Sequence, residues 1–427
     1  MKTAILVCVD KDINDANDSL DELASLIETL GIKEVQRVVQ KALKPNIKTY
    51  LGSGKIDELK QMETVEPVDY IVFDDELTPA QMFNVDEIFN ASVIDRAYVI
   101  LDIFRKRATT TEAQLEIKIA NLKYLLPRIK TFHEGFDRQS GKIGSKGSGE
   151  TQLELDQRFL ANQIYDNEQK LKEVLSRKKH EVNKRKNSNL KTIALVGYTN
   201  AGKSSTLNAL LNYLNKVEYK NNLINKSVEA EDKLFKTLTT SVRKLTYKNI
   251  PFLLSDTIGF INKIPNELLS SFMTTLEEAK NADLIIVVAD LTDKKLNMQL
   301  ETTIRTLEKI LGDKKPEILF LFNKIDEFND IPDIRFEVSG YKSLGYSNKD
   351  EKYQYKLLEL IKEFLLQDYE IIDLNIPYQD QKIIHKLETT TSIISKTYFD
   401  DYILYKVYCP KSYTKEYSIY RAIDMVM

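Results

Sequence analysis

A glycine-rich octapeptide, GYTNAGKS at residues 197–204, restricts the possible folds of this chain more than any other stretch. It has the spacing G-x-x-x-x-G-K-S, follows the apolar run TIALV (192–196) and precedes the helix-forming run SSTLNALLNYL. A strand, a glycine loop and a helix in this order predict a phosphate-binding loop, because loop N–H groups and the helix N-terminus then face one anion. The alternative is a plain glycine turn between a strand and a helix.

The loop predicts roles for individual side chains. Lys203 is expected to bridge the β- and γ-phosphates of a nucleotide, and the Ser204 hydroxyl is expected to ligate Mg²⁺. The predicted nucleotide-contacting residues of this loop are Gly197, Tyr198, Thr199, Asn200, Ala201, Gly202, Lys203, Ser204 and Ser205.

A second motif, DTIG at residues 256–259, directly follows the apolar strand IPFLLS. Asp256 can hold Mg²⁺ through a water molecule, and the Gly259 N–H can contact the γ-phosphate. Thr257 and Ile258 complete this predicted segment. By itself D-x-x-G usually marks a turn, but in register after a phosphate loop it indicates a nucleotide site.

A third motif, NKID at residues 323–326, follows the strand EILFLF (317–322) and predicts the base specificity. Asp326 can accept hydrogen bonds from guanine N1–H and its amino group, a pair of donors that adenine lacks. Asn323 is expected to support the loop, and Lys324, followed by Ile325, to stack over the base. Three residues after the expected strand RFEV are predicted to lie near guanine O6, with backbone N–H donors from the first two: Ser339, Gly340 and Tyr341.

These motifs occur in the order of a GTP-binding domain of the P-loop class, each at the end of an apolar strand, where α/β sheets bind ligands. A further hydroxyl must reach Mg²⁺ from between residues 205 and 255. The candidates in LFKTLTTSVRK are Thr237, Thr239, Thr240 and Ser241, and their spacing does not choose among them.

Phe260 follows DTIG, where many GTPases carry a glutamine that orients the attacking water. An apolar ring cannot do so, which predicts slow intrinsic hydrolysis and a missing group supplied by rearrangement or by a partner. The alternative is that Phe260 is simply a core residue.

The 427 residues predict two to four domains. The expected division is an N-terminal α/β domain (1–108), a long antiparallel helical hairpin (109–188), a P-loop GTPase domain (189–366) and a small α+β C-terminal domain (367–427). Residues 2–9 and 68–73 are predicted strands, with helices over 20–30 and 78–89. Thr111 is expected to cap the first hairpin helix, whose apolar seam is predicted to be Leu115, Ile119, Leu122, Leu126 and Ile129.

The predicted hairpin tip, residues 135–149, holds five of the chain's 14 glycines. Glycine allows the backbone to approach a partner closely. The cations Arg138, Lys142 and Lys146 make this tip a candidate RNA contact, whereas the alternative is a loop with no binding role. The net charge is −3, so any nucleic-acid contact must come from a local patch.

Composition excludes several protein classes. Cys8 and Cys409 are too few for a disulfide framework or a cysteine-rich zinc site. The N-terminal residues do not form a signal peptide, and no run of about 18 apolar residues occurs. These features predict a soluble, cytoplasmic protein without a membrane span.

Three segments resemble the HflX family of ribosome-associated GTPases. DTIGFINKIPNELLSSFMTTLEEAKNADL (256–284) resembles the family's DTVGFI stretch, and LFKTL (234–238) resembles its LFATL segment. KIGSKGSGETQLELDQR (142–158) is similar to the family's G-G-I-G-x-R-G-P-G-E-T-x-L-E signature, with Lys146 and Ser148 in place of Arg and Pro. By this resemblance Thr237 is the Mg²⁺ hydroxyl, in a nucleotide-contacting segment of Phe235, Lys236, Thr237, Leu238 and Thr239.

The resemblance implies a monomeric Mg²⁺-dependent GTPase that binds the large ribosomal subunit and its rRNA. It also implies placement of the N-terminal domain and hairpin near the peptidyl-transferase centre, and splitting of stalled or idle ribosomes under stress. One alternative is an ATP-dependent RNA-remodelling enzyme, based only on GSGK (52–55), which we interpret as a helix-opening turn. A nucleotide-sensing adaptor that binds other proteins is the other alternative.

Overall fold

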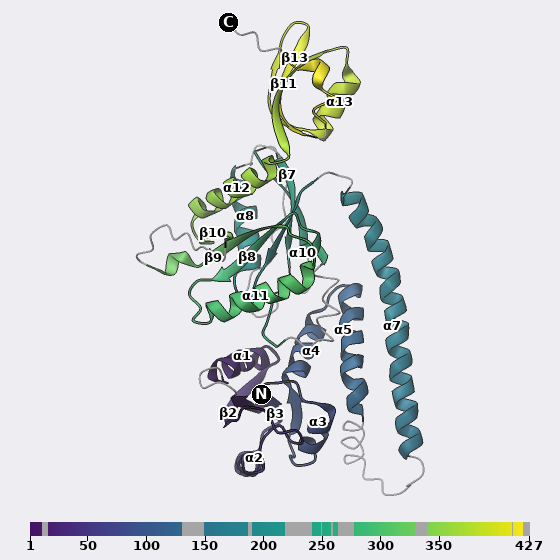
Figure 1. Ribbon diagram of the computed structural model, residues 1–427, viewed down its shortest axis with the longest axis vertical. Coiled ribbons are helices and arrows are strands. Elements are labelled where there is room, and N and C mark those ends of the chain that lie inside the picture. Colours follow the sequence, from purple (N-terminus) through teal and green to yellow (C-terminus); the bar gives the residue numbers. More distant parts are fainter. Residues whose placement is uncertain are drawn as a thin grey trace. The chain divides into compact units, whose positions relative to one another are not determined.

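The computed structural model describes residues 1–10, 16–129, 149–186, 190–217, 241–248, 250–257, 259–263, 277–328, 340–411 and 413–421. The chain divides into two compact units (Figure 1). The first unit contains Met1–Lys184 and a later segment that includes residues 259–263. The second contains the phosphate loop and the chain from Glu278 to the C-terminus.

The first unit contains a parallel four-stranded sheet of order β2-β1-β3-β4. Its strands are β1 (Lys2–Asp10), β2 (Ile32–Lys41), β3 (Tyr70–Phe73) and β4 (Ser92–Asp95). One face packs on α2 (Ser53–Val65) and α3 (Pro79–Asp86), while α1 (Ala16–Thr29) packs on α4 (Arg96–Arg107) and on β1. Strand, helix and strand in alternation give the parallel sheet that the sequence predicts.

Two local signals set the helix starts in this sheet domain. Thr78 caps α3, with its hydroxyl accepting from the Gln81 N–H while the Gln81 side chain returns to the Thr78 N–H, and Pro79 follows in the first turn. Asp95 caps α4 by accepting from the Tyr98 N–H at 2.8 Å. The sequence prediction of a helix over 78–89 is confirmed, although α3 ends at Asp86.

Two helices lie side by side beyond the sheet domain in the first unit (Figure 1). They are α5 (Thr111–Leu125), continued by the 3₁₀ turn η1 (Leu126–Arg128), and the long α7 (Gly149–Lys186). The Lys123 ammonium lies 2.8 Å from the Glu168 carboxylate and links the two helices. The expected cap is wrong by one residue, since Thr110 rather than Thr111 accepts from the Ala113 N–H.

The second unit contains a six-stranded sheet of order β10-β9-β8-β5-β7-β6. Its strands are β5 (Thr192–Val196), β6 (Ser241–Tyr247), β7 (Ile250–Asp256), β8 (Leu284–Asp290), β9 (Glu317–Asn323) and β10 (Lys342–Gly345). Only β6 runs antiparallel to its neighbour. The described helices are α8 (Lys203–Val217), α10 (Glu277–Asn281), α11 (Leu296–Leu311) and α12 (Glu351–Leu366), with the 3₁₀ turn η2 (Ile325–Glu327).

Burial explains why this sheet forms at the centre of the unit. Every residue of β8 is buried, as are the last four of β5. Continuous apolar runs of this kind suit parallel strands covered on both faces. The core cluster joins these strands to the apolar faces of α8 and α12.

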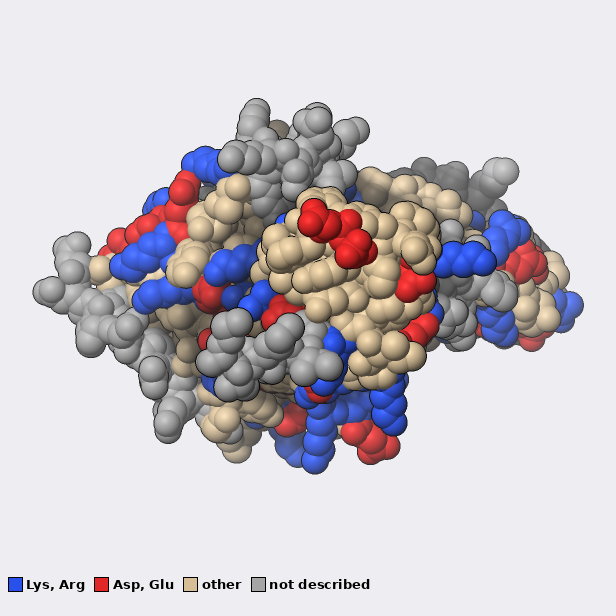
Figure 2. Space-filling model, turned by 90° about the horizontal axis from the view of Figure 1, so that it is seen from above, with Lys and Arg blue, Asp and Glu red and all other residues tan. Residues whose placement is uncertain are grey.

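The C-terminal part of the second unit is a three-stranded antiparallel sheet of order β11-β13-β12. It comprises β11 (Tyr369–Pro377), α13 (Gln381–Thr390), β12 (Ser392–Tyr398), β13 (Tyr402–Pro410) and the 3₁₀ turn η3 (Ser418–Tyr420). Tyr398, Phe399, Asp400 and Asp401 are exposed at the turn between β12 and β13. Figure 2 shows the molecule from above, where Asp and Glu side chains are surrounded by residues without charge.

Cys8 and Cys409 are both buried and unbonded to each other. Within the described ranges, no helix combines the length and the hydropathy needed to cross a membrane.

Candidate nucleotide site

The carboxyl ends of five parallel strands meet at one edge of the six-stranded sheet. The phosphate loop leaves β5 there, Asp256 ends β7, Asp290 ends β8 and Asn323 ends β9. Open α/β sheets bind ligands at this edge. The structure therefore brings together three motifs that lie up to about 130 residues apart in the sequence.

Two glycines of the phosphate loop are required by its backbone geometry. Gly197 has φ +147°, and a Cβ there would lie 2.1 Å from the Val288 carbonyl oxygen. Gly202 has φ +96°, and a Cβ there would lie 2.1 Å from Asn323 Nδ2. Larger residues at these positions would displace the loop from β8 and from the NKID motif.

Lys203 begins α8 and is 7% exposed. Its ammonium donates to the carbonyl oxygens of Gly197 at 3.1 Å and Tyr198 at 2.7 Å, so it lies over the loop where phosphate oxygens are expected. Burial lowers the pKa of Lys203 to about 8, against the opposing attraction of Asp256. A bound phosphate would place negative charge beside the buried ammonium and so stabilise its charged form.

Ser204 and Asp256 form an oxygen pair suited to a hard cation. The Ser204 hydroxyl donates to Asp256 Oδ2 at 2.6 Å, and Asp256 is fully buried. Thr257 anchors the strand end, since its hydroxyl donates to the Leu195 carbonyl at 2.7 Å. A hydroxyl and a carboxylate beside a phosphate loop are the donor types that Mg²⁺ prefers, so these residues fit the ion.

Asn323 joins the NKID motif to the phosphate loop, as the sequence predicts. Its Nδ2 donates to the Ala201 carbonyl at 3.0 Å, and the Asn348 amide donates to its Oδ1 at 3.3 Å. Lys324 has φ +64° and its ammonium lies 2.6 Å from Asp290 Oδ2. This ion pair fixes the lysine next to the loop that would hold the base.

Asp326 is the second residue of the turn η2, and both of its carboxylate oxygens have partners. Oδ1 accepts from the Ser347 hydroxyl at 2.8 Å, and Oδ2 lies 2.7 Å from the Lys349 ammonium. Although burial alone would raise the pKa of Asp326, these hydrogen bonds from Lys349 and Ser347 hold it below its ordinary value. The carboxylate is therefore ionised at neutral pH and ready to accept donors.

The prediction that Gly340 and Tyr341 lie near guanine O6 is wrong. They precede β10, which pairs in parallel with β9 from Lys342 opposite Leu319, so they lie at the opposite edge of the sheet from the phosphate loop. The prediction assumed that RFEV is the strand before the base-contacting loop. The described strand is β10, of sequence KSLG, so the loop at its carboxyl end lies further along the chain.

The loop that does follow β10 is Tyr346–Lys349, and the sequence reasoning missed it. Tyr346 donates its backbone N–H to the Phe322 carbonyl at 2.8 Å, and Ser347 bonds Asp326. A usable signal was present, since Ser347 and Asn348 lie just before Asp350, which caps α12. Their backbone N–H groups, and not that of Gly340, are therefore the candidates for contact with the base among the described residues.

Several predicted residues lie outside the described residues. They are Phe235, Lys236, Thr237, Leu238, Thr239, Thr240, Ile258, Ser339, Arg138, Lys142 and Lys146. The choice of the Mg²⁺ hydroxyl and the role of the hairpin tip therefore stay predictions.

Phe260 is 2% exposed, and Ile261 beside it is also 2% exposed. The ring offers no hydrogen-bonding atom to a water molecule, so the described part of DTIGF contains no glutamine-like group. The buried position is consistent with the core alternative as well.

The tetrapeptide GSGK opens α2, as the sequence interpretation expects. Gly52 is the N-cap residue, with extended backbone, and its N–H donates to the Gln40 side chain at 2.8 Å. The Lys55 ammonium pairs with Glu58 at 2.8 Å. These local contacts account for the tetrapeptide without a nucleotide.

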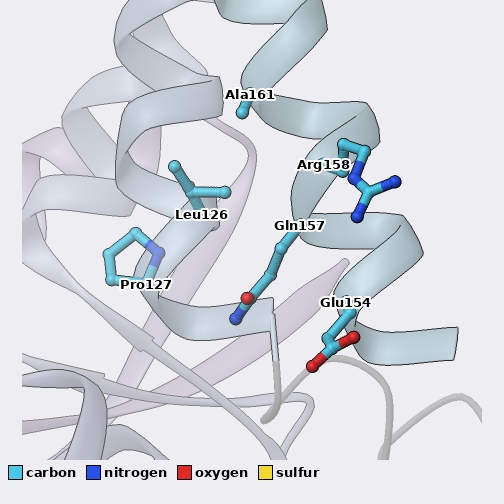
Figure 3. A pocket seen from close by; sticks show the side chains of 6 residues that line it. All are labelled: Leu126, Pro127, Glu154, Gln157, Arg158 and Ala161. Carbon is cyan, nitrogen blue, oxygen red and sulfur yellow. The ribbon is translucent and has the colours of Figure 1, made fainter. Parts of the chain in front are cut away.

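An open groove lies between the end of α5 and the start of α7 (Figure 3). Its volume is about 700 Å³, and Leu126 and Pro127 form its apolar side. The α7 side carries Glu154, Gln157, Arg158 and Ala161.

Three known families match consecutive parts of the chain. Residues 17–105 match the family described as GTP-binding GTPase N-terminal, and residues 107–185 match GTP-binding GTPase Middle Region. Residues 192–324 match the family described as 50S ribosome-binding GTPase.

Curated relatives extend this similarity over most of the chain. GTPase HflX of Flavobacterium psychrophilum is 41% identical over 72% of this chain and 71% of its own length. GTPase HflX of Caldanaerobacter subterraneus is 34% identical over 92% of this chain and 88% of its own length. A GTP-binding protein from Sulfolobus solfataricus, solved with GDP, is 23% identical, with a TM-score of 0.42, over 86% of this chain and 99% of its own. From the matched families and the curated relatives, the chain belongs to the HflX family of GTP-binding, GTP-hydrolysing enzymes.

Proposed function

We propose that this chain hydrolyses GTP with Mg²⁺ at the strand edge described above, in association with the large ribosomal subunit, and that it dissociates stalled or idle ribosomes. The observation that carries the first part is the hydrogen-bonded assembly of the phosphate loop, Asp256, Asn323 and Asp326 at one edge. The second part is supported by the family to which the chain belongs.

The phosphate end of the site contributes charge and donors. Lys203 and the loop N–H groups would hold the β- and γ-phosphates. The Ser204 hydroxyl and the predicted Thr237 hydroxyl would ligate Mg²⁺, and Asp256 would hold the ion through a water molecule. The ion would neutralise charge that develops on the transferred phosphoryl group.

The base end of the site selects guanine. Asp326 is held ionised by Lys349 and Ser347, and it would accept from guanine N1–H and the amino group. Adenine offers no such pair of donors to this carboxylate, and sites built to accept them discriminate strongly against bases that lack them. Backbone N–H groups of Ser347 and Asn348 would face the O6 side.

Hydrolysis by the free protein is expected to be slow, because Phe260 supplies no group that orients water. Binding to the ribosome would supply or position the missing group. Partner-supplied groups accelerate other GTPases by roughly 10³–10⁵-fold. This interpretation makes the ribosome an activator of the enzyme as well as its target.

The RNA contact is expected away from the exposed turn of the C-terminal sheet. Asp400 and Asp401 are exposed there, and carboxylates repel RNA phosphates. The predicted tip with Arg138, Lys142 and Lys146 is a better candidate, although it lies outside the described residues.

The testing experiment measures GTP hydrolysis and co-sedimentation with purified large subunits. We expect at least tenfold faster turnover with subunits, and retention on them with a non-hydrolysable GTP analogue but not with GDP. Replacing Arg138, Lys142 and Lys146 by Ala should reduce sedimentation without changing GTP affinity. The matched control removes three exposed charges elsewhere, Lys382, Lys406 and Lys415.

Two outcomes would contradict the proposal. Equal hydrolysis rates with and without subunits would remove the activating role of the ribosome. Absence of co-sedimentation in every nucleotide state would instead favour the adaptor alternative.

A further inference from the structure

Asp74 is a fully buried carboxylate at the carboxyl end of β3 in the first unit. Its Oδ1 accepts from Arg96 at 2.6 Å, and its Oδ2 accepts from the Ser19 hydroxyl at 2.6 Å. Arg96 is 1% exposed and pairs also with Glu22. The Arg96 guanidinium and the Ser19 hydroxyl therefore already pair with both oxygens of Asp74.

A lysine from a distant part of the sequence completes the cluster. The Lys263 ammonium pairs with Asp74, and it lies 2.8 Å from Asp75 Oδ1. Lys263 belongs to the first unit, although it is separated from Asp74 by 189 residues of sequence. Burial alone would lower the pKa of Lys263, but the two carboxylates outweigh it and hold that pKa above its ordinary value.

The segment that carries Lys263 begins at the D-x-x-G motif. Phe260 and Ile261 are each 2% exposed, so three of the four residues after Gly259 are buried or ion-paired. On the other side, Thr257 is fixed to β5 through the Leu195 carbonyl. Gly259 therefore lies two residues after Thr257, which is anchored to β5, and one residue before the buried side chain of Phe260.

We propose that Lys263 is a positioning residue for GTP, which orders the Gly259 N–H through its ion pairs with Asp74 and Asp75. This inference rests on the proposed contact between that N–H and the γ-phosphate. GDP has no γ-phosphate, so it gains nothing from an ordered Gly259. Lys263 thereby contributes to the discrimination of GTP from GDP through the segment 259–263.

Preorganisation of the segment 259–263 lowers the free-energy cost of binding GTP. A segment held in place before binding spares the ligand the conformational entropy of ordering it. When the ammonium is removed, that entropy cost falls on GTP alone, while the affinity for GDP is unaffected. By thermodynamic reciprocity, GTP then strengthens the Lys263 ion pairs as much as they strengthen GTP binding.

The experiment compares the full-length protein with Lys263→Met, which keeps an unbranched chain but removes the charge. We expect affinity for a non-hydrolysable GTP analogue to fall at least fivefold, the lower end of the usual range for coupled sites, with GDP affinity within twofold. Lys263→Arg retains the charge and should restore most of the difference.

Lys60→Met is the matched control. Lys60 pairs at 3.0 Å with Glu63, a buried carboxylate in the same unit, but it lies on α2 and not on the segment that follows D-x-x-G. This variant should leave both nucleotide affinities unchanged. If Lys263→Met acted only by destabilising the first unit, Lys60→Met would reduce the nucleotide affinities to a similar extent.

Hydrogen exchange of the Asp74 amide supplies a second readout. That N–H donates to the Val7 carbonyl at 2.8 Å, and we expect slower exchange with the GTP analogue than with GDP, a difference that Lys263→Met removes. Equal GTP-to-GDP affinity ratios in the parent and Lys263→Met would overturn the inference, as would a ratio that rises. Failure of the parent protein to bind either nucleotide would overturn the proposed function instead.

Discussion

Lys203 places an ammonium group where only 7% of the residue is exposed, and burial holds its pKa near 8. Between pH 8 and the ordinary lysine pKa of about 10.5, the unfolded chain binds more protons than the native state, so stability rises with pH in that window. A phosphate that contacts the ammonium favours its charged form. Nucleotide binding should therefore draw a proton onto Lys203 in mildly alkaline solution.

Proton uptake on GTP binding tests this charge balance. At pH 8.5, a pKa that rises from about 8 to 10 or more takes up roughly 0.7 of a proton. Calorimetry in buffers of different ionisation enthalpy measures this number. Lys203→Arg should abolish the uptake, because a guanidinium stays charged throughout. Uptake retained in that variant would place the titrating group elsewhere.

Asp326 gives the second residue-scale prediction. Asp326→Asn presents an amide where guanine needs an acceptor, so affinity for GTP should fall at least 100-fold while xanthosine nucleotides, whose C2 oxygen accepts, gain affinity. Titration calorimetry with both nucleotides measures the exchange. As a control, Lys349→Ala removes only a partner that is 74% exposed, so its effect should stay within about fivefold. Unchanged GTP affinity in Asp326→Asn would remove Asp326 from the base site.

At the scale of elements, α5 is fastened to the sheet domain by a buried tyrosine. The Tyr124 hydroxyl donates to Asp95 Oδ1 at 2.9 Å, and Asp95 is fully buried, with a pKa raised by that burial. Arg128 stacks on the same ring at 3.9 Å and donates to the Leu77 carbonyl at 2.7 Å. The helix that begins the hairpin is thus joined to the cap of α4.

Tyr124→Phe should lower the free energy of unfolding by about 1.5–3 kcal/mol, since it leaves a buried carboxylate with one donor fewer. Urea unfolding of the full-length protein at neutral pH measures the change. Tyr98→Phe is the matched control, because Tyr98 is only partly buried, and its effect should lie within about 0.5 kcal/mol. Equal effects of the two substitutions would contradict the fastening role of the Tyr124 hydroxyl.

Elements with strong local signals were predictable from sequence. The strands β1 and β3 carry continuous apolar runs, and α3 has both a capping threonine and a first-turn proline. In contrast, β10 is a short, half-buried edge strand of sequence KSLG, which has weak strand propensity. The sequence pattern therefore favours the preceding segment RFEV as the strand. Because the strand is predicted in the wrong place, the loop that contacts the base is also predicted in the wrong place.

The first hairpin helix shows a second limit of local pattern. A narrow seam was expected, but among its members only Ile119 and Leu122 are buried, whereas Ile117 and Tyr124 are buried outside it. The reason is that α5 packs on α4 as well as lying beside α7. A heptad pattern describes packing against one neighbouring helix, whereas a helix that packs against two neighbours buries a wider face.

At the scale of the whole molecule, the motif chemistry was readable because each motif lies at the end of a strand. The sequence pattern predicts Lys203, Asp256, Asn323 and Asp326 at one edge, and the hydrogen bonds that involve their motifs support that prediction. The cluster around Asp74 was not readable, because it joins residues from distant segments with no recurrent spacing. Long-range ion pairs of this kind leave no local trace in a sequence.

The Lys263 ion pairs also impose an order on biosynthesis. A ribosome makes Asp74 189 residues before Lys263, an interval of roughly 10–40 s at 5–20 residues per second. During that time the nascent N-terminal domain must keep Asp74 buried with Arg96 as its cationic partner. The part of the protein that is synthesised first therefore matures only after strand β7 of the GTPase domain has been translated.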